Sequence, residues 1–150
     1  MPTQSEHEAI AAHNELVLRH LLAQDLRFLS SWATTIAFYR ALHLVNALLQ
    51  GDPKSPGRNP PAHTTRNEWI RREPRYHGFA VVYDMLYRAS RVARYEKTCP
   101  GDFNAVFPLR TVERAFAGSY QRQLEREIAS LLDGDDFLRR VNSPLTPPSR

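Results

Sequence analysis

The feature that most constrains this chain is the stretch of residues 31–50, SWATTIAFYRALHLVNALLQ, which is apolar around nearly all of its circumference when placed on a helix. Two apolar rows follow the helical spacing and leave only a narrow polar edge between them. The rows consist of Ile36, Ala37, Ala41, Leu44 and Leu48, and of Phe38, Leu42, Val45 and Leu49. A helix of this kind is normally enclosed by neighbouring helices. We therefore expect residues 31–50 to form the central helix of an all-α bundle.

Breaks in the sequence divide the rest of the chain into further helices. The proline- and glycine-rich residues 51–62 are incompatible with the interior of a helix or strand, and residues 99–102 form a second break. The predicted helices are, in order, residues 5–24, the central helix 31–50, a short helix from about 65 that ends before Pro74, residues 78–96 and residues 109–133, with one or two further turns over 135–141. We predict a single up-and-down bundle of about five helices over residues 1–141, followed by a proline-rich disordered tail over 142–150.

Local signals indicate where several of these helices begin and end. Residues 5–8 and 65–68 have the S/T-x-x-E form of a capping box, which predicts helix starts at both places. Gly51 and Gly134 follow the central and last long helices, and we expect both at the C′ position, where a left-handed backbone favours glycine.

Positive charge is concentrated in the middle of the chain. Residues 58–94 contain eight arginines and three acidic residues, a net charge of +5, whereas residues 1–57 carry −1 and residues 95–150 carry 0. Arginine suits bidentate phosphate contacts and base stacking, although codon bias in a GC-rich genome also explains a general excess of arginine. The basic run at 71–75 is typical of a solvated loop. The clustering over 58–94 favours a negatively charged partner such as RNA.

Other classes of protein are excluded by what the sequence lacks. No apolar run reaches the roughly 20 residues of a membrane span, and no secretory signal opens the chain. Cys99 is the single cysteine, so an internal disulfide and a thiolate metal cage are excluded. We expect a cytoplasmic protein with no membrane association, no metal and no cofactor, since glycine-rich phosphate loops and paired metal-binding histidines are also missing.

The polar edge of the central helix is the first candidate site. Tyr39, His43, Asn46 and Gln50 are spaced 4, 3 and 4 residues apart, so they line one edge. One interpretation is that these groups are satisfied inside the bundle or at a dimer interface. The other is that His43 lines a cleft, where it contacts a ligand or acts as acid or base.

Two further candidates lie at helix ends. His63 and Arg66 open the short third helix, either as part of its cap or as an anion site built on the free N–H groups. Arg91, Arg94 and Tyr95 end the following helix, where they either complement the helix dipole or grip a phosphate and stack on a base. If these elements converge, we expect His43 at the floor of the site and the arginines, with His63, as its walls. The candidate catalytic residues are His43, His63 and Arg94, and the candidate phosphate-binding residues are Asn46, Arg66, Arg91, Arg94 and Tyr95.

Three of these stretches, taken in order, resemble the HEPN family, whose name refers to its occurrence in higher eukaryotes and prokaryotes. The resemblance covers about residues 10–97. It rests on Phe38-Tyr39-Arg40-Ala41-Leu42-His43 with Asn46-Ala47-Leu48-Leu49, on His63 with Arg66, and on Tyr83, Leu86, Ser90, Arg91, Ala93, Arg94 and Tyr95. It implies a helical bundle that forms a homodimer and is associated with RNA cleavage, with toxin–antitoxin pairs or with antiviral defence.

The sequence departs from catalytically active members of that family. These carry an arginine followed four to six residues later by a histidine, and neither Arg91 nor Arg94 has a histidine at that distance. Two literal matches lie elsewhere, in the ranges 58–63 and 71–77, but prolines interrupt both. The pattern favours the catalytically silent branch of the family.

Three functions therefore stay open at this point. The first is a silent HEPN-like module that binds nucleic acid, an antitoxin or a defence-system protein. The second is a metal-independent endoribonuclease with a non-standard arginine–histidine site, in which a base activates the 2′-OH and cations stabilise the phosphorane. The third is a structural or regulatory subunit of a larger assembly.

Overall fold

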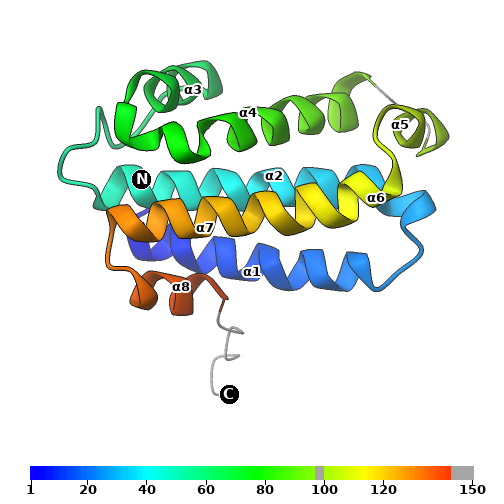
Figure 1. Ribbon diagram of the computed structural model, residues 1–150, viewed down its shortest axis with the longest axis horizontal. Coiled ribbons are helices and arrows are strands. Elements are labelled where there is room, and N and C mark those ends of the chain that lie inside the picture. The colour runs from blue at the N-terminus through cyan, green and yellow to red at the C-terminus, as the bar shows by residue number, and fades with distance from the viewer. Residues whose placement is uncertain (97–99, 143–150) are drawn as a thin grey trace.

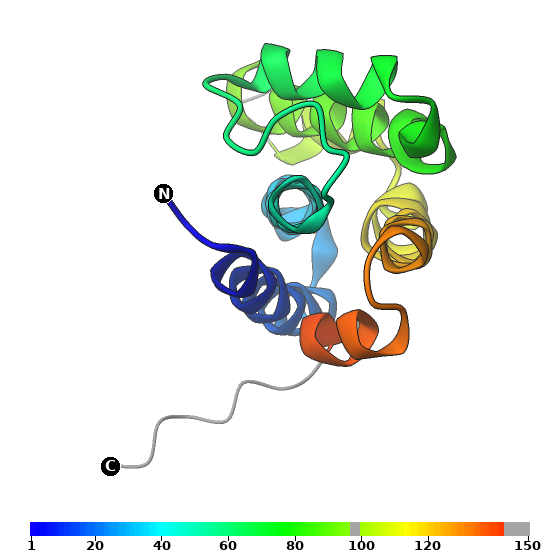
Figure 2. The same ribbon diagram turned by 90° about the vertical axis from the view of Figure 1, so that its left-hand side faces the viewer.

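The computed structural model describes residues 1–96 and 100–142, and over these residues it is helical without any strand. This confirms the all-α prediction. Helix α2 (Leu26–Gly51) lies at the centre, and the long helices α1 (Gln4–Leu22), α4 (His77–Arg91) and α7 (Tyr120–Leu131) run lengthwise beside it (Figure 1). Viewed end-on, α2 is surrounded by these three helices (Figure 2). One hydrophobic core contains side chains from α1, α2, α3, α4, α5, α7 and α8.

Helix α1 begins one residue before the prediction and with a different cap. Thr3 is the N-cap, its hydroxyl accepts from the Glu6 N–H, and the Glu6 carboxylate accepts from the Thr3 N–H. The capping box predicted from Ser5 and Glu8 is therefore wrong, because the same S/T-x-x-E pattern occurs two residues earlier. Glu8 instead faces α8 (Asp135–Asn142), where it accepts a hydrogen bond of 2.5 Å from Arg140.

Helix α2 is longer than predicted at its start. Asp25 caps it by accepting from the Arg27 N–H, so the helix begins at Leu26 rather than Ser31. Gly51 is still helical, and Asp52 is the C-cap residue. The C′ prediction for Gly51 is wrong, since Gly134 alone among the described residues has a positive φ, of 61°. Gly134 does follow the end of α7, where its N–H donates to the carbonyl of Ala129, but it lies two residues beyond the C-cap residue Leu132 and therefore one beyond C′.

The proline-rich loop leads from Asp52 to α3 (His63–Arg72), which crosses the end of α2 instead of running parallel to it (Figure 2). The capping box predicted over 65–68 is wrong: α3 starts at His63 after an Ala62 N-cap without a side-chain cap, and Glu68 pairs with Arg72 at 2.6 Å. A 3₁₀ turn, η1 (Pro74–Tyr76), then joins α3 to α4. Asp52 anchors the loop to this turn by accepting from the Tyr76 hydroxyl at 2.6 Å.

The C-terminal half contains two π-helical segments. The first, η2 (Val92–Glu96), extends α4. The helix predicted over 109–133 is present as α6 (Leu109–Thr111), the π-helical η3 (Val112–Ser119) and α7, preceded by the short α5 (Pro100–Val106). Cys99 and residues 143–150 of the predicted tail lie outside the described residues. Asn142, which was predicted to begin the tail, is instead the last residue of α8.

Candidate functional site

Every member of the predicted polar edge of α2 meets a side chain or backbone group from a different part of the chain. The Tyr39 hydroxyl accepts from Arg94 at 3.1 Å, and His43 contacts His7 at 2.9 Å. The Asn46 amide oxygen accepts from Arg66 at 2.8 Å. The Gln50 amide donates to Asn59 at 2.7 Å and to the Arg58 carbonyl at 3.0 Å. We call this row of four α2 residues, together with the side chains that face it, the polar seam. The structure thus brings together η2, α1, α3 and the proline-rich loop along one edge of α2.

His43 contacts His7 of α1, a residue that no pattern in the sequence indicated. The two Nδ1 atoms lie 2.9 Å apart, and the ring centroids lie 5.2 Å apart. Burial lowers the pKa of His43 to about 4, with further contributions from His7 and Arg66. Burial, and then Arg66, also lowers the pKa of His7. Both rings are therefore neutral near pH 7, so one Nδ1 donates its proton to the other.

Arg66 occupies the middle of the seam and is only 8% exposed. Its Nε donates to the Asn46 Oδ1 at 2.8 Å, and its Nη1 lies 3.2 Å from the Nδ1 of His63. Because Nη1 is a donor, His63 accepts through Nδ1. Burial lowers the pKa of His63, and the charges of Arg66, Arg94 and Arg91 lower it further. The predicted pair His63 and Arg66 thus forms a contact between a neutral imidazole and a guanidinium.

Arg94 lies at the other end of the seam, among aromatic rings. Its Nη1 donates to the Tyr39 hydroxyl, and its Nε donates to the Ser90 carbonyl at 3.3 Å. The guanidinium carbon lies 4.9, 5.5 and 5.7 Å from the ring centroids of Tyr95, Tyr39 and Phe38. Such distances are within the range of cation–π attraction.

The other predicted members of this group lie at its outer edge. Tyr95 is 69% exposed, so one side of the cage around Arg94 is open to solvent. The Nη1 of Arg91 donates to the Tyr87 hydroxyl at 3.2 Å. The Tyr87 ring in turn packs on His63, at 5.7 Å between centroids.

The site that we expected, with His43 as its floor and the arginines and His63 as its walls, is only partly present in the structure. The charge of Arg66 acts on His43, whereas the charges of Arg91 and Arg94 act on His63. The seam is therefore a line of contacts along α2 rather than one pocket over His43.

The charge of the seam is not balanced by acidic groups. No carboxylate among the described side chains forms an ion pair with Arg66 or Arg94. Their ring partners are His63 for Arg66, and Tyr39 and Tyr95 for Arg94. The two literal arginine–histidine matches are also not assembled as a pair. His63 faces Arg66 and the Phe38 and Tyr87 rings, and the His77 Nε2 contacts the Arg71 carbonyl at 3.2 Å.

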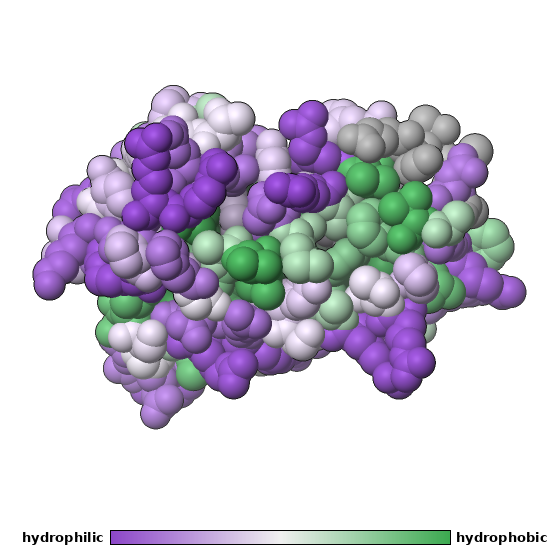
Figure 3. All heavy atoms as spheres, turned by 45° about the horizontal axis from the view of Figure 1, so that its top comes forward, coloured by the Kyte–Doolittle hydropathy of each residue, from purple (hydrophilic) through white to green (hydrophobic). Residues whose placement is uncertain are grey.

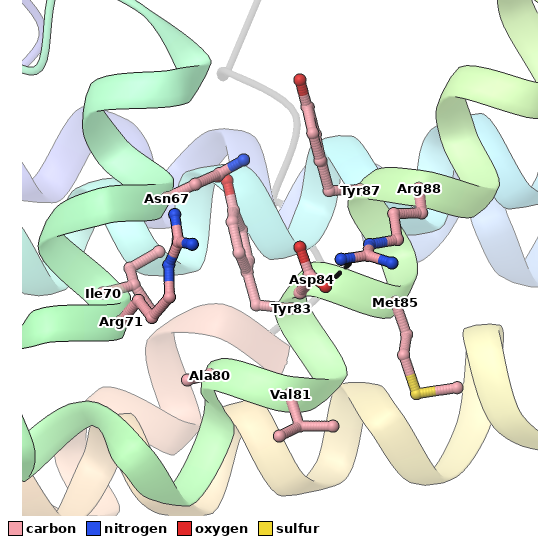
Figure 4. A pocket seen from close by; sticks show the side chains of 10 residues that line it. All are labelled: Asn67, Ile70, Arg71, Ala80, Val81, Tyr83, Asp84, Met85, Tyr87 and Arg88. Carbon is pink, nitrogen blue, oxygen red and sulfur yellow. Dashed lines mark ion pairs between the residues drawn. The ribbon is translucent and has the colours of Figure 1, made fainter.

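A pocket of about 410 Å³ lies between α3 and α4, away from the predicted site residues (Figure 4). Ile70, Ala80, Val81 and Met85 give it apolar walls, and Asp84 and Arg88 form an ion pair of 2.9 Å at its edge. Figure 3 shows the corresponding face, where hydrophilic side chains gather over α3 and hydrophobic ones toward α5 and α6. Val81 and Met85 of α4 and Val106 of α5 are exposed apolar residues. Sequence periodicity assigned α4 a buried and a polar face and did not indicate this pocket.

Among the described residues no group of three or more histidine, cysteine or acidic side chains is placed to hold a metal ion, and no helix there is long and apolar enough to cross a membrane. The seam can therefore offer guanidinium groups, neutral imidazoles and aromatic rings to an anionic ligand.

Comparison of the chain with protein-family models, with curated proteins and with solved structures found no match.

Proposed function

We propose that this protein is a HEPN-like helical module that binds single-stranded RNA along the polar seam without cleaving it. The observation that carries the proposal is the environment of Arg94, a guanidinium that touches aromatic rings and hydroxyl groups and no described carboxylate. A guanidinium in such a cage can pair with a phosphate, while the exposed ring of Tyr95 offers a face on which a base stacks.

The charge distribution supports the same ligand. The +5 net charge of residues 58–94 is spread over the loop, α3, η1, α4 and η2, and of these the loop, α3 and η2 contribute residues to the seam. Part of that charge is used within the protein, since Arg75 pairs with Asp52 and Arg72 with Glu68. Arg58, Arg66 and Arg94 form no ion pair with a described side chain, so their charge is available to a polyanion.

Absence of cleavage is proposed because the arginine–histidine spacing of active HEPN proteins is missing and neither literal match is assembled in space. The homodimer, the antitoxin or defence-system partner and the cytoplasmic location implied by the resemblance or composition stay predictions.

Fluorescence anisotropy with a labelled single-stranded RNA tests the proposal. We expect Arg94→Ala to weaken RNA binding by about tenfold, which corresponds to the loss of one stacked or phosphate-paired group. The matched control is Arg126→Ala, because Arg126 is exposed on α7, on the opposite side of α2 from the N-terminal end of α1 (Figure 2). Equal RNA affinity of the two variants would contradict the proposed site.

The same RNA, incubated with the protein in EDTA, tests the absence of cleavage. We expect the RNA to stay intact. Cleavage that survives chelation and disappears in His63→Ala would instead establish a metal-independent endoribonuclease.

A further inference from the structure

A second, smaller pocket lies at the opposite end of the seam from Arg94. Its volume is about 130 Å³, and His7, Asn46, Arg58, Asn59 and Arg66 contribute its polar lining. The first two residues of the chain and Pro60 complete the walls. Figure 2 looks onto this end of the molecule, where the N-terminal segment, the end of α2 and the proline-rich loop converge.

The lining of this pocket is cationic and amidic, and it includes no acidic residue. Arg66 is held from within the fold by the Asn46 amide, whereas Arg58 is exposed at the mouth, and its guanidinium forms no hydrogen bond or ion pair with another described side chain. The loop that presents Arg58 is fixed to α2, because the Gln50 amide donates to the Arg58 carbonyl and to the Asn59 Oδ1. A rigid buried guanidinium and an adjustable exposed one thus face the same small space.

Size and charge together select a class of ligand. A space of about 130 Å³ suits a group of one phosphorus and its oxygens. A terminal phosphomonoester carries between one and two negative charges at neutral pH, because its second pKa is about 6, and its three free oxygens accept several hydrogen bonds. An internal phosphodiester carries one negative charge. The RNA strand continues from it on both sides, so both continuations would have to leave the pocket.

We propose that this pocket binds the terminal phosphomonoester of an RNA strand, whose following nucleotides lie along the seam toward Arg94. The inference rests on the proposed RNA-binding function for the source of the phosphate. Asn46, at the pocket, and Tyr39, beside Arg94, are seven residues apart on α2, which corresponds to about 10 Å along the helix. A short single strand can therefore occupy both ends of the seam at once.

The test uses the full chain and three otherwise identical short RNAs, with a 5′-phosphate, with a 3′-phosphate and with hydroxyl groups at both ends. We expect one phosphorylated RNA to bind at least about tenfold more tightly than the hydroxyl RNA, as is typical of charged hydrogen bonds made at one end. The comparison of the two phosphorylated RNAs identifies the end that is recognised. Arg58→Ala, a change at an exposed loop position, should abolish this preference, so that this variant binds the phosphorylated and the hydroxyl RNAs with equal affinity. Arg126→Ala should preserve it.

Inorganic phosphate provides an arm of the experiment that does not involve RNA. We expect saturable changes in the His7 and Asn46 NMR signals of the parent protein, and their loss in Arg58→Ala. Equal affinity for all three RNAs would overturn the pocket assignment while leaving RNA binding in place. Binding of phosphate without binding of any RNA would instead overturn the proposed function and keep the pocket as a phosphomonoester site.

Discussion

Two clusters of arginine lie on different sides of α2, and they differ in how their charge is balanced. In the first, Arg40 is completely buried, with the Glu15 and Glu125 carboxylates at 3.0 and 2.8 Å. Arg122 joins the same two carboxylates at 3.3 and 2.7 Å, and Arg19 pairs with Glu15 at 3.3 Å, so each carboxylate is paired with more than one arginine. In the polar seam, Arg66 and Arg94 have amide, imidazole and hydroxyl partners and no described carboxylate. The comparison indicates that the Arg40 cluster stabilises the fold, whereas the seam leaves positive charge for a ligand.

The Arg40 cluster also receives neutral hydrogen bonds that complete its surroundings. Arg40 donates to the Gln121 Oε1 and to the Val141 carbonyl, each at 3.2 Å. These contacts connect α2 to α7 and α8. The Nε of Arg40 and the Oε2 of Glu15 are ion-paired without the alignment of a hydrogen bond, so charge attraction supplies most of that contact.

The largest expected effect is the loss of stability on Arg40→Met. The substitution keeps much of the side-chain volume but removes the buried cation between Glu15 and Glu125, which leaves only the more exposed Arg19 and Arg122 to compensate them. Breaking a buried ion pair in this way costs about 3–5 kcal/mol. Urea unfolding followed by circular dichroism measures the change. A loss below about 1 kcal/mol would show that the cluster contributes little to the fold.

A smaller effect is expected from the histidines of the seam when pH is lowered. His43, His7 and His63 have lowered pKa values in the folded protein, so the unfolded chain binds protons that the folded chain does not. The free energy of unfolding should therefore fall as pH decreases from about 6.5 toward 4, with a slope of at most about 1.4 kcal/mol per pH unit for each histidine. Solvent screening reduces this value at partly exposed rings.

The measurement is a series of urea unfolding curves between pH 7 and 5, where most carboxylates stay ionised. His43→Gln should flatten the dependence on pH, and replacement of the exposed His20 on α1 provides the matched control. An unchanged slope in His43→Gln would mean that His43 is protonated equally in the folded and unfolded chains.

The smallest expected effect on stability is that of Arg94→Ala. Its guanidinium is partly exposed and has no carboxylate to leave unpaired, so we expect the free energy of unfolding to change by less than about 1 kcal/mol. Urea unfolding under the conditions used for Arg40→Met makes the two values directly comparable. A loss similar to that of Arg40→Met would remove the distinction between a stabilising and a binding cluster.

The helical pattern of the sequence was sufficient to predict the all-α class, the central position of residues 31–50 and the break over the proline-rich loop. The break predicted over 99–102 is wrong, because Pro100 begins the short helix α5, where the first turn tolerates proline and glycine. Helix starts were predicted less well. The S/T-x-x-E pattern occurs twice near the start of α1, from Thr3 and from Ser5, and does not indicate which copy is used. At α3 the single copy, from Thr65, lies inside a helix that begins at His63. The polar edge of α2 followed from its spacing. Its partner His7 did not, since the side-chain contact joins residues 36 positions apart and depends on how α1 packs on α2.

The Arg40 cluster shows a second limit of sequence reasoning. A helix that is apolar nearly all round predicts a buried environment, and a charged residue within it is compensated only by partners from other helices. Those partners, Glu15 and Glu125, are 25 and 85 residues away from Arg40, and no local pattern connects them. The small pocket at Arg58 is likewise formed by four separate parts of the chain.

The most direct test of the central claim is the salt dependence of RNA binding by the parent protein and by Arg94→Ala. Counterion release makes the logarithm of the binding constant fall linearly with the logarithm of salt concentration, with a slope of about −0.7 for each phosphate of a single strand that is neutralised. If the seam holds RNA, the parent protein should bind RNA at low salt with a slope of about −2 or steeper, and Arg94→Ala should lower its magnitude by about 0.7. A slope near zero, or the same slope in both proteins, would contradict the assignment of the uncompensated arginines to RNA binding.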